Sequence, residues 1–317
     1  MTTPEPDGNT IVYFDHRFVP LRDATVSILT HALHYGTGVF DGIRGYYDSL
    51  ENELFLVRAR EHFLRWKTNA GILRINVPLS ALELTEVAAE LCRRNDFRTG
   101  VYIRPVAYKS AARIGVNPDD ADAFSIIAIP FGVYLDSEKG LHAGVSSWRR
   151  VEDNAIPGRA KICGAYVNSA LAGDEARRSG FDEAIFLTES GHVAEGATCN
   201  IFMFRSGRLV TPPSTDNILE GITRSCIMDL ARTELGLEVV ERSIDRSELY
   251  LCDELFFTGT AVEIGPITQV DHRPVGHGRI GSVTRDLRDL YHKATRGHLD
   301  SYRDWLTPVH RAVPALA

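Results

Sequence analysis

The pattern of hydrophobic and polar positions in the first part of the chain predicts a mixture of strands and helices. Short runs rich in Ile, Val, Tyr and Phe predict a strand and turn over residues 11–20 and buried strands over 99–108 and 123–133. Longer segments with apolar residues at helical spacing predict helices over residues 50–71 and 78–94. This part of the chain is therefore expected to form an α+β layer.

The second part of the chain is richer in short strand patterns. The apolar run that ends near residue 131 gives way to charge and glycine over residues 132–140, which indicates a linker. Two helices are expected over 169–179 and 221–235, and strands over 143–148, 183–188, 200–204, 208–210, 238–242 and 254–258. We therefore predict a small N-terminal α/β domain over residues 1–131, the linker over 132–140 and a larger C-terminal domain over 141–317.

Composition and charge narrow the class of protein. The 317 residues are 44% hydrophobic and 24% charged, which is ordinary for a globular protein with a large core. The formal net charge of −7 gives no broad attraction to nucleic acid or to an anionic membrane, so neither is expected as a partner. The acidic, polar start of the chain carries no secretory signal, and the most apolar stretch, residues 123–135, is too short to span a bilayer.

The five cysteines are an odd number, widely spread and without a C-x-x-C pair. This spacing argues against a disulfide framework and against a structural zinc site, so no metal is expected. Reduced thiols and a cytoplasmic location are the plain interpretation.

Two short motifs suggest other chemistry but lack the necessary context. Gly36, Gly38 and Gly42 resemble a dinucleotide-binding fingerprint, but the third glycine comes one position late and no strand–turn–helix pattern surrounds them. His31 and His34 are one helical turn apart, yet no glutamate general base lies between them as in zinc proteases. Packed or capping histidines explain this pair better than a metal site.

Lysine is scarce, and one lysine has an unusual setting. Of the 35 basic residues only five are lysines, and Lys161 lies among small residues in the segment 157–169 (PGRAKICGAYVNS), with no acid within several positions. Desolvation favours the neutral amine, which is the condition for imine chemistry, and Tyr166 is placed to hydrogen-bond an oxyanion beside such an imine. On this segment alone, an ordinary surface lysine explains the pattern equally well.

Three later segments favour the first interpretation. Glu195 is flanked by glycine and alanine between two predicted strands, where a carboxylate has a reason to be if it keeps a pyridine ring protonated. Residues 221–223 open a helix whose free N–H groups suit a phosphate. Residues 258–261 (TGTA) end a strand in small residues whose amides can approach an anion closely.

Taken together, the segments resemble the fold-type IV, pyridoxal-phosphate-dependent aminotransferases, and most closely the branched-chain amino acid aminotransferases. The likeness runs through nearly the whole chain, in the order of the family. The matching stretches are 31–44 (HALHYGTGVFDGIR), 60–62 (REH), 102–105 (YIRP), 115–118 (GVNP), 145–149 (VSSWR), 195–202 (EGATCNIF), 219–224 (LEGITR) and 258–261 (TGTA). The resemblance implies an α/β (α+β type) fold, with a small N-terminal α/β domain and a larger pseudo-barrel domain that carries the cofactor lysine.

The resemblance also implies a set of residues that bind pyridoxal 5′-phosphate. Lys161 matches the catalytic lysine, which holds the cofactor covalently and moves the proton. Glu195 matches the partner of the pyridine nitrogen, and Tyr166 matches the phenol that bonds the ring oxygen O3′. The remaining cofactor-binding positions are Arg60, Leu219, Gly221, Ile222, Thr223 and Thr260.

The implied reaction is transamination between branched-chain L-amino acids (Leu, Ile, Val) and 2-oxoglutarate. Arg104 matches the arginine that helps to receive the second carboxylate of 2-oxoglutarate. The other implied substrate-binding positions are Tyr35, Phe40, Arg44, Tyr102, Val116, Phe131, Tyr134, Gly259, Thr260 and Ala261. The family works as a homodimer or a higher homo-oligomer, in which a loop corresponding to residues 114–117 completes the neighbouring active site.

A few departures from the family pattern leave alternatives open. Asp41 stands where the family usually has Glu, Phe131 where Trp is frequent, and residues 109–113 (KSAAR) replace a more glycine-rich run. These changes fall in the substrate pocket and leave the cofactor residues untouched. The alternatives are an (R)-amine or D-amino acid transaminase, a lyase of the aminodeoxychorismate type, and a non-catalytic binding protein on the same scaffold.

Overall fold

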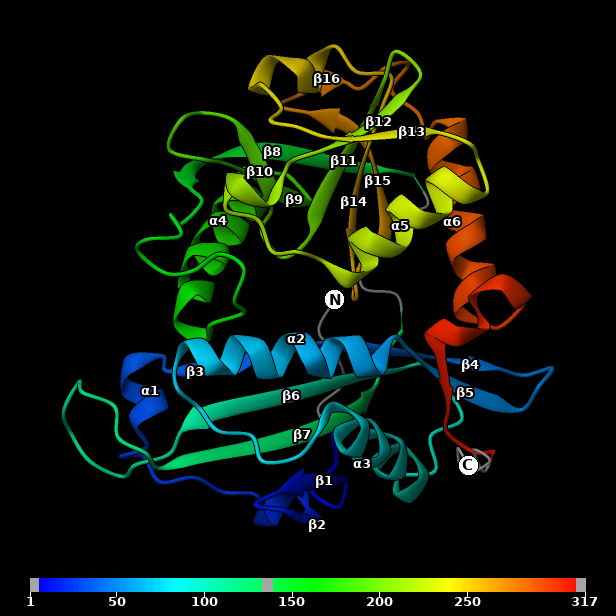
Figure 1. Cartoon of the computed structure of the whole chain (residues 1–317). Helices are drawn as coiled ribbons and strands as arrows, with labels where there is room; N and C mark the ends of the chain where they lie inside the picture. Colours follow the sequence, from blue (N-terminus) through cyan, green and yellow to red (C-terminus); the bar gives the residue numbers. More distant parts are fainter. Residues whose placement is uncertain (1–5, 133–138, 312–317) are drawn as a thin grey trace. The chain divides into compact units, whose positions relative to one another are not determined.

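The computed structural model describes residues 6–132 and 139–311, and the described part divides into two compact units (Figure 1). The first unit holds the described residues up to Gly132, the segment Ala160–Gly164 and the described residues from Lys293 on. The second holds the other described residues, up to Arg159 and Ala165–His292. The predicted linker over 132–140 lies mostly outside the described residues and stays a prediction.

The first unit is built on one eight-stranded sheet with the strand order β17-β5-β4-β6-β7-β1-β2, and β3 also pairs with β6. The strands are β1 (Ile11–Phe14), β2 (Arg17–Pro20), β3 (Gly38–Phe40), β4 (Ile43–Asp48), β5 (Glu53–Val57), β6 (Val101–Lys109), β7 (Asp122–Pro130) and β17 (Leu306–Pro308). All of their pairings are antiparallel. The hairpin β6–β7 forms the middle of the sheet, and every second residue of β6 is buried, as expected for a strand with one face toward a core.

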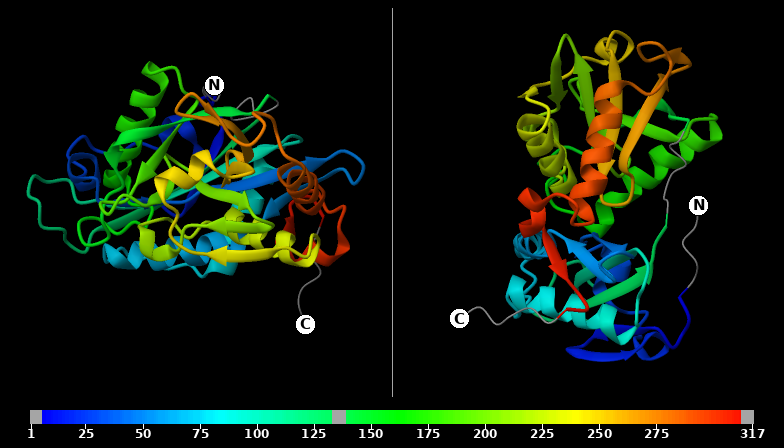
Figure 2. Two further views of the ribbon diagram at one scale, coloured as in Figure 1. Left: turned by 90° about the horizontal axis from the view of Figure 1, so that it is seen from above. Right: turned by 90° about the vertical axis from the view of Figure 1, so that its right-hand side faces the viewer.

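Two helices, α2 (Ala59–Ile72) and α3 (Ala81–Arg94), pack against each other and against this sheet (Figure 1, Figure 2). A short helix, α1 (His31–Tyr35), precedes β3. Helix α3 begins after Ser80, whose hydroxyl accepts a hydrogen bond from the Glu83 amide while the Glu83 carboxylate accepts one from the Ser80 amide. This reciprocal cap ends the chain's extended run and fixes the start of the helix.

The predicted helix over residues 50–71 is wrong in its first part. Residues of β5 form a strand that pairs with β4 on one side and β17 on the other, and all five of its side chains are buried. A short apolar run that is buried on both faces has no period, so its pattern does not distinguish a strand from the start of a helix. The helix proper begins only at Ala59.

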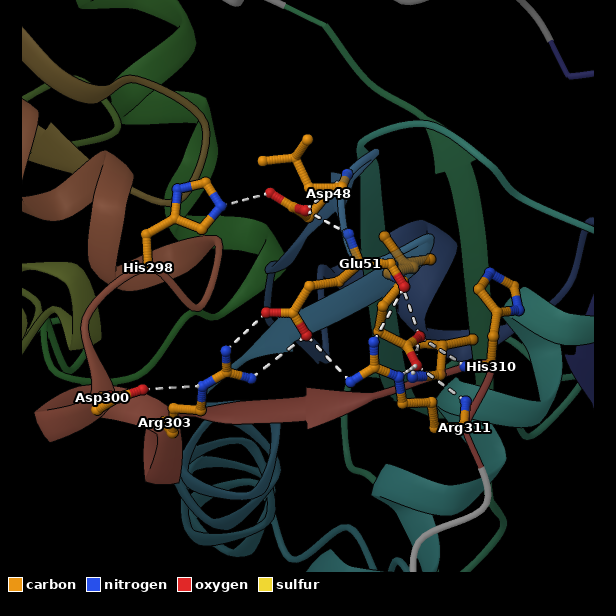
Figure 3. Close-up of polar contacts among 11 residues, drawn as sticks. Asp48, Glu51, His298, Asp300, Arg303, His310 and Arg311 are labelled. Carbon is orange, nitrogen blue, oxygen red and sulfur yellow. Dashed lines mark hydrogen bonds and ion pairs between the residues drawn. The ribbon is translucent and has the colours of Figure 1, made fainter.

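The last described residues return to the first unit. Glu53 is fully buried, and its carboxylate accepts hydrogen bonds from the backbone amides of Val309, His310 and Arg311 at 2.7–3.0 Å. Figure 3 shows two further anchors: Arg303 and Arg311 both point to Glu51, at 2.6 and 3.0 Å. The strand β17 therefore adds to the sheet edge with charged contacts on either side of it.

The segment Ala160–Gly164 is also part of the first unit, which differs from the predicted domain division. The Phe40 amide donates a hydrogen bond to the Lys161 carbonyl at 3.0 Å, and Val39 forms an isolated β-bridge with Ile162. Because these backbone contacts join the segment to β3, Lys161 belongs to the first unit and not, as predicted, to the second. The residues from Lys293 on differ from the prediction in the same way, since β17 pairs with β5.

The second unit is built on a nine-stranded mixed sheet with the order β10-β9-β8-β15-β14-β11-β12-β13, and β16 also pairs with β15. Its strands are β8 (Leu141–Arg149), β9 (Glu183–Leu187), β10 (Val193–Gly196), β11 (Asn200–Arg205), β12 (Arg208–Thr211), β13 (Glu238–Glu241), β14 (Glu254–Gly259), β15 (Glu263–Val270) and β16 (Arg273–Pro274). Its helices are α4 (Tyr166–Arg178), α5 (Ile222–Thr233) and α6 (Ser282–Thr295), the last of which runs on past residue 292. A large apolar core lies on this sheet, with Phe257, Ile201 and Leu255 among its buried members.

Candidate active site

Lys161 is held by its backbone against β3. The two neighbouring side chains, Ala160 and Ile162, are buried, whereas Lys161 itself is half-buried. Its ammonium nitrogen Nζ lies 5.2 Å from the centroid of the Phe40 ring. A cation at this distance from an aromatic face is attracted by the ring, so Phe40 helps to fix where the amine points.

A pair of glycines brings the lysine segment close to the chain before β3. Gly36 has a φ of +66°, and its carbonyl accepts a hydrogen bond from the Gly164 amide at 3.1 Å. A Cβ atom on Gly36 would lie 2.6 Å from Cα of Gly164, which is closer than real Cβ atoms come. Glycine is therefore required at position 36 both for the backbone conformation and for the space.

Arg104 lies on the same aromatic ring as Lys161. Its guanidinium carbon is 4.5 Å from the centroid of Phe40 and 5.0 Å from that of Tyr102, and it donates a hydrogen bond to the Tyr102 hydroxyl at 2.9 Å. Its Nε is buried and has no hydrogen-bond partner among the described residues. A guanidinium with a buried donor that has no partner there is suited to a carboxylate ligand.

Arg44 contacts main chain at the end of β7. One guanidinium nitrogen donates hydrogen bonds to the carbonyls of Phe131 and Gly132, at 3.2 and 2.8 Å, and the group lies 4.4 Å from the Phe131 ring centroid. The ring of Phe131 lies 5.1 Å from that of Tyr102. The predicted substrate residues Arg44, Tyr102, Phe131, Phe40 and Arg104 are thus brought into one neighbourhood of the first unit.

Three further predicted residues of the first unit lie apart from this cluster or outside the described residues. Tyr35 is half-buried, and its hydroxyl accepts a hydrogen bond from the Gly115 amide at 3.1 Å. Val116, the next residue of that loop, is 68% exposed. Arg60 is an exposed residue of α2, and Tyr134 lies outside the described residues.

A buried ion pair that the sequence did not predict joins β3 to α2. Asp41 is fully buried and accepts hydrogen bonds from Arg65 at 2.7 Å and from His62 at 2.9 Å. Burial alone would raise the pKa of Asp41, but the charge of Arg65 and the His62 hydrogen bond hold it well below its usual value. Burial lowers the pKa of His62, so the charged pair is that of Asp41 and Arg65. This pair fixes Phe40, the residue before Asp41, relative to the helix that carries Arg60.

In the second unit, Glu195 is a buried carboxylate fixed by three donors. Its Oε1 lies 2.9 Å from the guanidinium of Arg150, and its Oε2 accepts hydrogen bonds from the Asn200 side chain at 3.0 Å and the Leu219 amide at 3.2 Å. Neither Arg150 nor the amide of Asn200 as a partner of Glu195 was predicted. A carboxylate that is buried, charged and oriented is what a pyridinium nitrogen requires.

The start of α5 is shaped for an anion. Gly221 is the N-cap residue and no described side chain caps the helix there, so the first amides, including those of Ile222 and Thr223, have no acceptor within the helix. A Cβ on Gly221 would lie 2.0 Å from Oδ1 of Asn200, so only glycine fits. The helix spans 12 residues, and its dipole favours a negative charge at this end.

The remaining predicted residues lie at the ends of elements of the second unit. Tyr166 is half-buried and begins α4. Gly259 ends β14, and Thr260 and Ala261 form the turn before β15. Just before them, Thr258 is fully buried and its hydroxyl has no hydrogen-bond partner among the described residues. A buried hydroxyl in this state indicates that a polar ligand or a water belongs nearby.

These residues fit a pyridoxal phosphate cofactor. An amine, a buried carboxylate with a fixed orientation, and an uncapped helix start with an obligatory glycine are the three groups that its aldehyde, ring nitrogen and phosphate require. In the described ranges, no group of three or more His, Cys, Asp or Glu residues is placed to hold a metal ion. A search of the same ranges finds no helix with the length and apolar character needed to cross a membrane.

Comparison with known proteins gives the same family. The model of the amino-transferase class IV family matches residues 38–270. A probable branched-chain-amino-acid aminotransferase of Aquifex aeolicus is 47% identical over 94% of this chain and 96% of its own length.

Two crystal structures of similar proteins carry informative ligands. The branched-chain aminotransferase of Thermoproteus uzoniensis with norvaline has a TM-score of 0.91 and 43% identity, covering 96% of this chain and 100% of that one. A branched-chain amino acid aminotransferase whose source is abbreviated T.th., in complex with N-(5′-phosphopyridoxyl)-L-glutamate, has a TM-score of 0.90 and 40% identity, covering 95% and 99%. The expected fold class is confirmed by these matches, and the chain belongs to the class IV aminotransferases, the fold-type IV enzymes that depend on pyridoxal phosphate.

Proposed function

We propose that this protein is a branched-chain amino acid aminotransferase, which transfers the amino group of L-leucine, L-isoleucine or L-valine to 2-oxoglutarate with pyridoxal 5′-phosphate as cofactor. Relatives over nearly the full length carry this activity in their names. The similar crystal structures hold an aliphatic amino acid in one case and a phosphopyridoxyl derivative of glutamate in the other. These two ligands correspond to the two kinds of substrate in the proposed reaction.

The observation that carries the substrate class is the environment of the Lys161 amine. Phe40 presents one ring to both Lys161 and Arg104, at 5.2 and 4.5 Å. The apolar ring suits an aliphatic side chain, while the guanidinium beside it suits the second carboxylate of a dicarboxylic acid. Apolar contacts separate substrates by only about 1–3 kcal/mol per methylene, so one pocket accepts Leu, Ile and Val together.

When bound, pyridoxal phosphate supplies the carbonyl that takes up the amino group and a ring that withdraws electrons from Cα. Lys161 binds the cofactor covalently and then carries the proton to and from Cα as the general base. Glu195 keeps the ring nitrogen protonated, and Tyr166 donates a hydrogen bond to the ring oxygen. The phosphate and ring are held by Arg60, Leu219, Gly221, Ile222, Thr223 and Thr260.

The substrate residues have two tasks in this proposal. Arg104 receives the second carboxylate of 2-oxoglutarate, and Phe40 packs against the aliphatic side chain. The other members that we assign to the substrate pocket are Tyr35, Arg44, Tyr102, Val116, Phe131, Tyr134, Gly259, Thr260 and Ala261.

The proposal is tested with the purified holoenzyme and single amine donors. L-leucine, D-alanine and (R)-1-phenylethylamine are each mixed with the enzyme, and the loss of the visible absorbance of the bound cofactor is followed. The fastest loss is expected with L-leucine. If L-leucine reacts most slowly, the enzyme is a D-amino acid or (R)-amine transaminase, and a Lys161→Ala variant with full activity would refute the whole assignment.

We also infer that the enzyme works as a homodimer or a larger homo-oligomer. Several apolar side chains of the first unit are exposed to an unusual degree, namely Ile28, Leu33, Ile114 and Val116, at 66–80%. A second copy of the chain would cover them. Sedimentation of wild type and of Leu33→Glu tests this: wild type should sediment as a dimer or larger, the variant as a smaller species.

A cytoplasmic location belongs to the same proposal. The five cysteines are free thiols in the structure, four of them buried. Buried thiols without partners suit a reducing compartment. Separating cytoplasm from membranes and culture medium of the producing cells, with an antibody to this chain, tests the location.

A further inference from the structure

The residue that holds Glu195 most directly is Arg150, which follows β8. The guanidinium and the carboxylate are 2.9 Å apart, and their side chains are only 10% and 7% exposed. Two side chains with opposite charges are thus buried together in a unit whose other core side chains are mostly apolar. A buried charge without a partner takes or loses a proton instead of staying charged.

Arg150 is itself fixed in place. Its Nε donates a hydrogen bond to the Asn217 carbonyl at 3.2 Å, and its backbone amide donates one to the Leu187 carbonyl at 2.9 Å. The guanidinium also lies 5.9 Å from the centroid of the Phe186 ring. Asn217 adopts a left-handed conformation with a φ of +60°, which aims its carbonyl at this position. Arg150 is therefore oriented before any cofactor binds.

The other two donors to Glu195 carry no charge. Asn200 contributes its amide side chain and Leu219 its backbone amide. The charged side chains on the elements around β10 are Glu183 on β9, Arg205 on β11, Asp174 and Glu175 on α4, Arg224 on α5, Glu220 beside Leu219, and the pair of His192 and Asp245. Each of these has hydrogen-bond or ion-pair partners other than Glu195. Arg150 is the cation that is bonded to the carboxylate.

We propose that Arg150 is a positioning residue that keeps Glu195 ionised and oriented toward the ring nitrogen of the cofactor. The inference rests on the proposed role of Glu195. With the guanidinium present, the buried carboxylate stays charged at neutral pH and holds the proton on the ring. Without it, the carboxylate takes up a proton, because burial disfavours the charged form, and a neutral acid no longer stabilises a protonated ring.

The test measures cofactor affinity as a function of pH. Pyridoxal phosphate is titrated into the cofactor-free protein at pH 6.5 and 8.5, with tryptophan fluorescence and the absorbance of the bound cofactor as readouts. We expect Arg150→Met to bind at least about tenfold more weakly than wild type at pH 6.5 and to recover most of this loss at pH 8.5, where Glu195 ionises again. Arg150→Lys, which keeps the charge, should stay close to wild type at both pH values.

Two further variants control for other effects of the change. Arg149→Met removes the same charge from the neighbouring exposed position and should bind as wild type does. Arg150→Gln keeps donors for the Asn217 carbonyl but no charge, so it should behave like Arg150→Met even if the methionine variant folds poorly. A loss that is equal at both pH values, or that Arg150→Lys does not repair, would reduce Arg150 to a packing role and overturn the inference.

Glu195→Gln separates this inference from the proposed function. If Glu195→Gln binds the cofactor as wild type does, with the same absorbance, the proposed role of Glu195 fails. If Glu195→Gln binds weakly at both pH values while Arg150→Met matches wild type throughout, only the inference on Arg150 fails.

Discussion

A single methyl group tests the contact that brings the lysine segment to β3. In Gly36→Ala the new Cβ would lie 2.6 Å from Gly164 Cα, so the segment with Lys161 has to move. Because a misplacement of about 1 Å at a reacting group can cost about 100-fold in rate, we expect a loss of kcat of that order in the half-reaction with L-leucine.

The matched control for this change is Gly180→Ala. Gly180 has a similar positive φ of +81°, but a Cβ there meets no atom within 4 Å. It should lose only the cost of the left-handed conformation, about 1–2 kcal/mol, and keep the wild-type kcat. Thermal unfolding and stopped-flow absorbance measure the two effects, and equal kcat values for the two variants would contradict the role of the glycine contact.

The second prediction at this scale concerns Asp41. Asp41→Asn leaves the buried Arg65 without its carboxylate, and we expect a loss of about 3–5 kcal/mol in the free energy of unfolding in urea. Asp174→Asn is the control, because Asp174 pairs with Arg177 and Arg178 at the surface, where such pairs contribute about 0–1 kcal/mol.

The same carboxyl gives a pH dependence with a definite sign. The pKa of Asp41 is depressed in the folded protein, so its contribution to stability is complete above the unfolded value of about 3.9 and is lost as pH falls through the folded value. The stability advantage of wild type over Asp41→Asn should therefore shrink as the pH falls below about 4. If the difference between the two proteins is constant from pH 7 to pH 3, the assigned charge state of Asp41 is wrong.

Individual residues differ in how far the sequence predicts them. Lys161 was accessible because the chain has few lysines and this one lies among small residues, and Glu195 because its neighbours are glycine and alanine. Arg150 was not, because it is far from Glu195 along the chain and only the pairing of β8, β9 and β10 brings them together. Asp41 was noticed only as a departure, since its partners lie on another element.

At the scale of elements, the loop between β6 and β7 depends on one buried lysine. Lys109 is 1% exposed, and its ammonium donates to the carbonyls of Arg74 and Asp119 and pairs with Asp122, all within 2.9 Å. Both ends of the loop that carries Val116 are therefore tied to one charge. The loop is anchored at its base although Val116 itself is exposed.

Lys109→Met should loosen this loop and destabilise the protein. Removing one partner of a buried pair is expected to lower the free energy of unfolding by about 3–5 kcal/mol. If Val116 contributes to the substrate pocket as proposed, KM for L-leucine should also rise while the absorbance of the bound cofactor stays the same. Lys139→Met, at an exposed position, should change neither quantity, and an unchanged KM in Lys109→Met would argue against the role of the loop.

The sequence predicted elements well where their boundaries are chemically marked. Helix α3 was expected over residues 78–94 and spans Ala81–Arg94, since Ser80 and Glu83 mark its start. The strand β5 was missed because it is buried on both faces, and β3 and β4 because they are short or interrupted by glycine and aspartate. Their strand character comes from partners distant in sequence, above all β6.

At the scale of the whole molecule, the last described residues are part of the first unit's stability. Glu53→Gln replaces one carboxylate oxygen with an amide group that faces backbone donors instead of accepting from them. Leaving such buried donors unsatisfied is expected to lower the free energy of unfolding by about 1–3 kcal/mol. Hydrogen exchange of the amides of residues 309–311 should also become faster than in wild type.

The control for this prediction is Asp300→Asn. Asp300 is 99% exposed and 3.5 Å from Arg303, so its loss should leave both stability and exchange unchanged. Wild-type exchange rates at residues 309–311 in Glu53→Gln would mean that β17 alone holds this segment to the sheet.

The first unit is assembled from three separate stretches of chain, and this has a consequence for synthesis on the ribosome. When residues up to 132 have emerged, β5 is still an open sheet edge, because its partner β17 lies more than a hundred residues downstream along the same chain. An open edge invites pairing with other chains. The nascent protein therefore spends most of its translation time with an unfinished first unit, and chaperone binding to β5 should end only when residues 306–311 leave the exit tunnel.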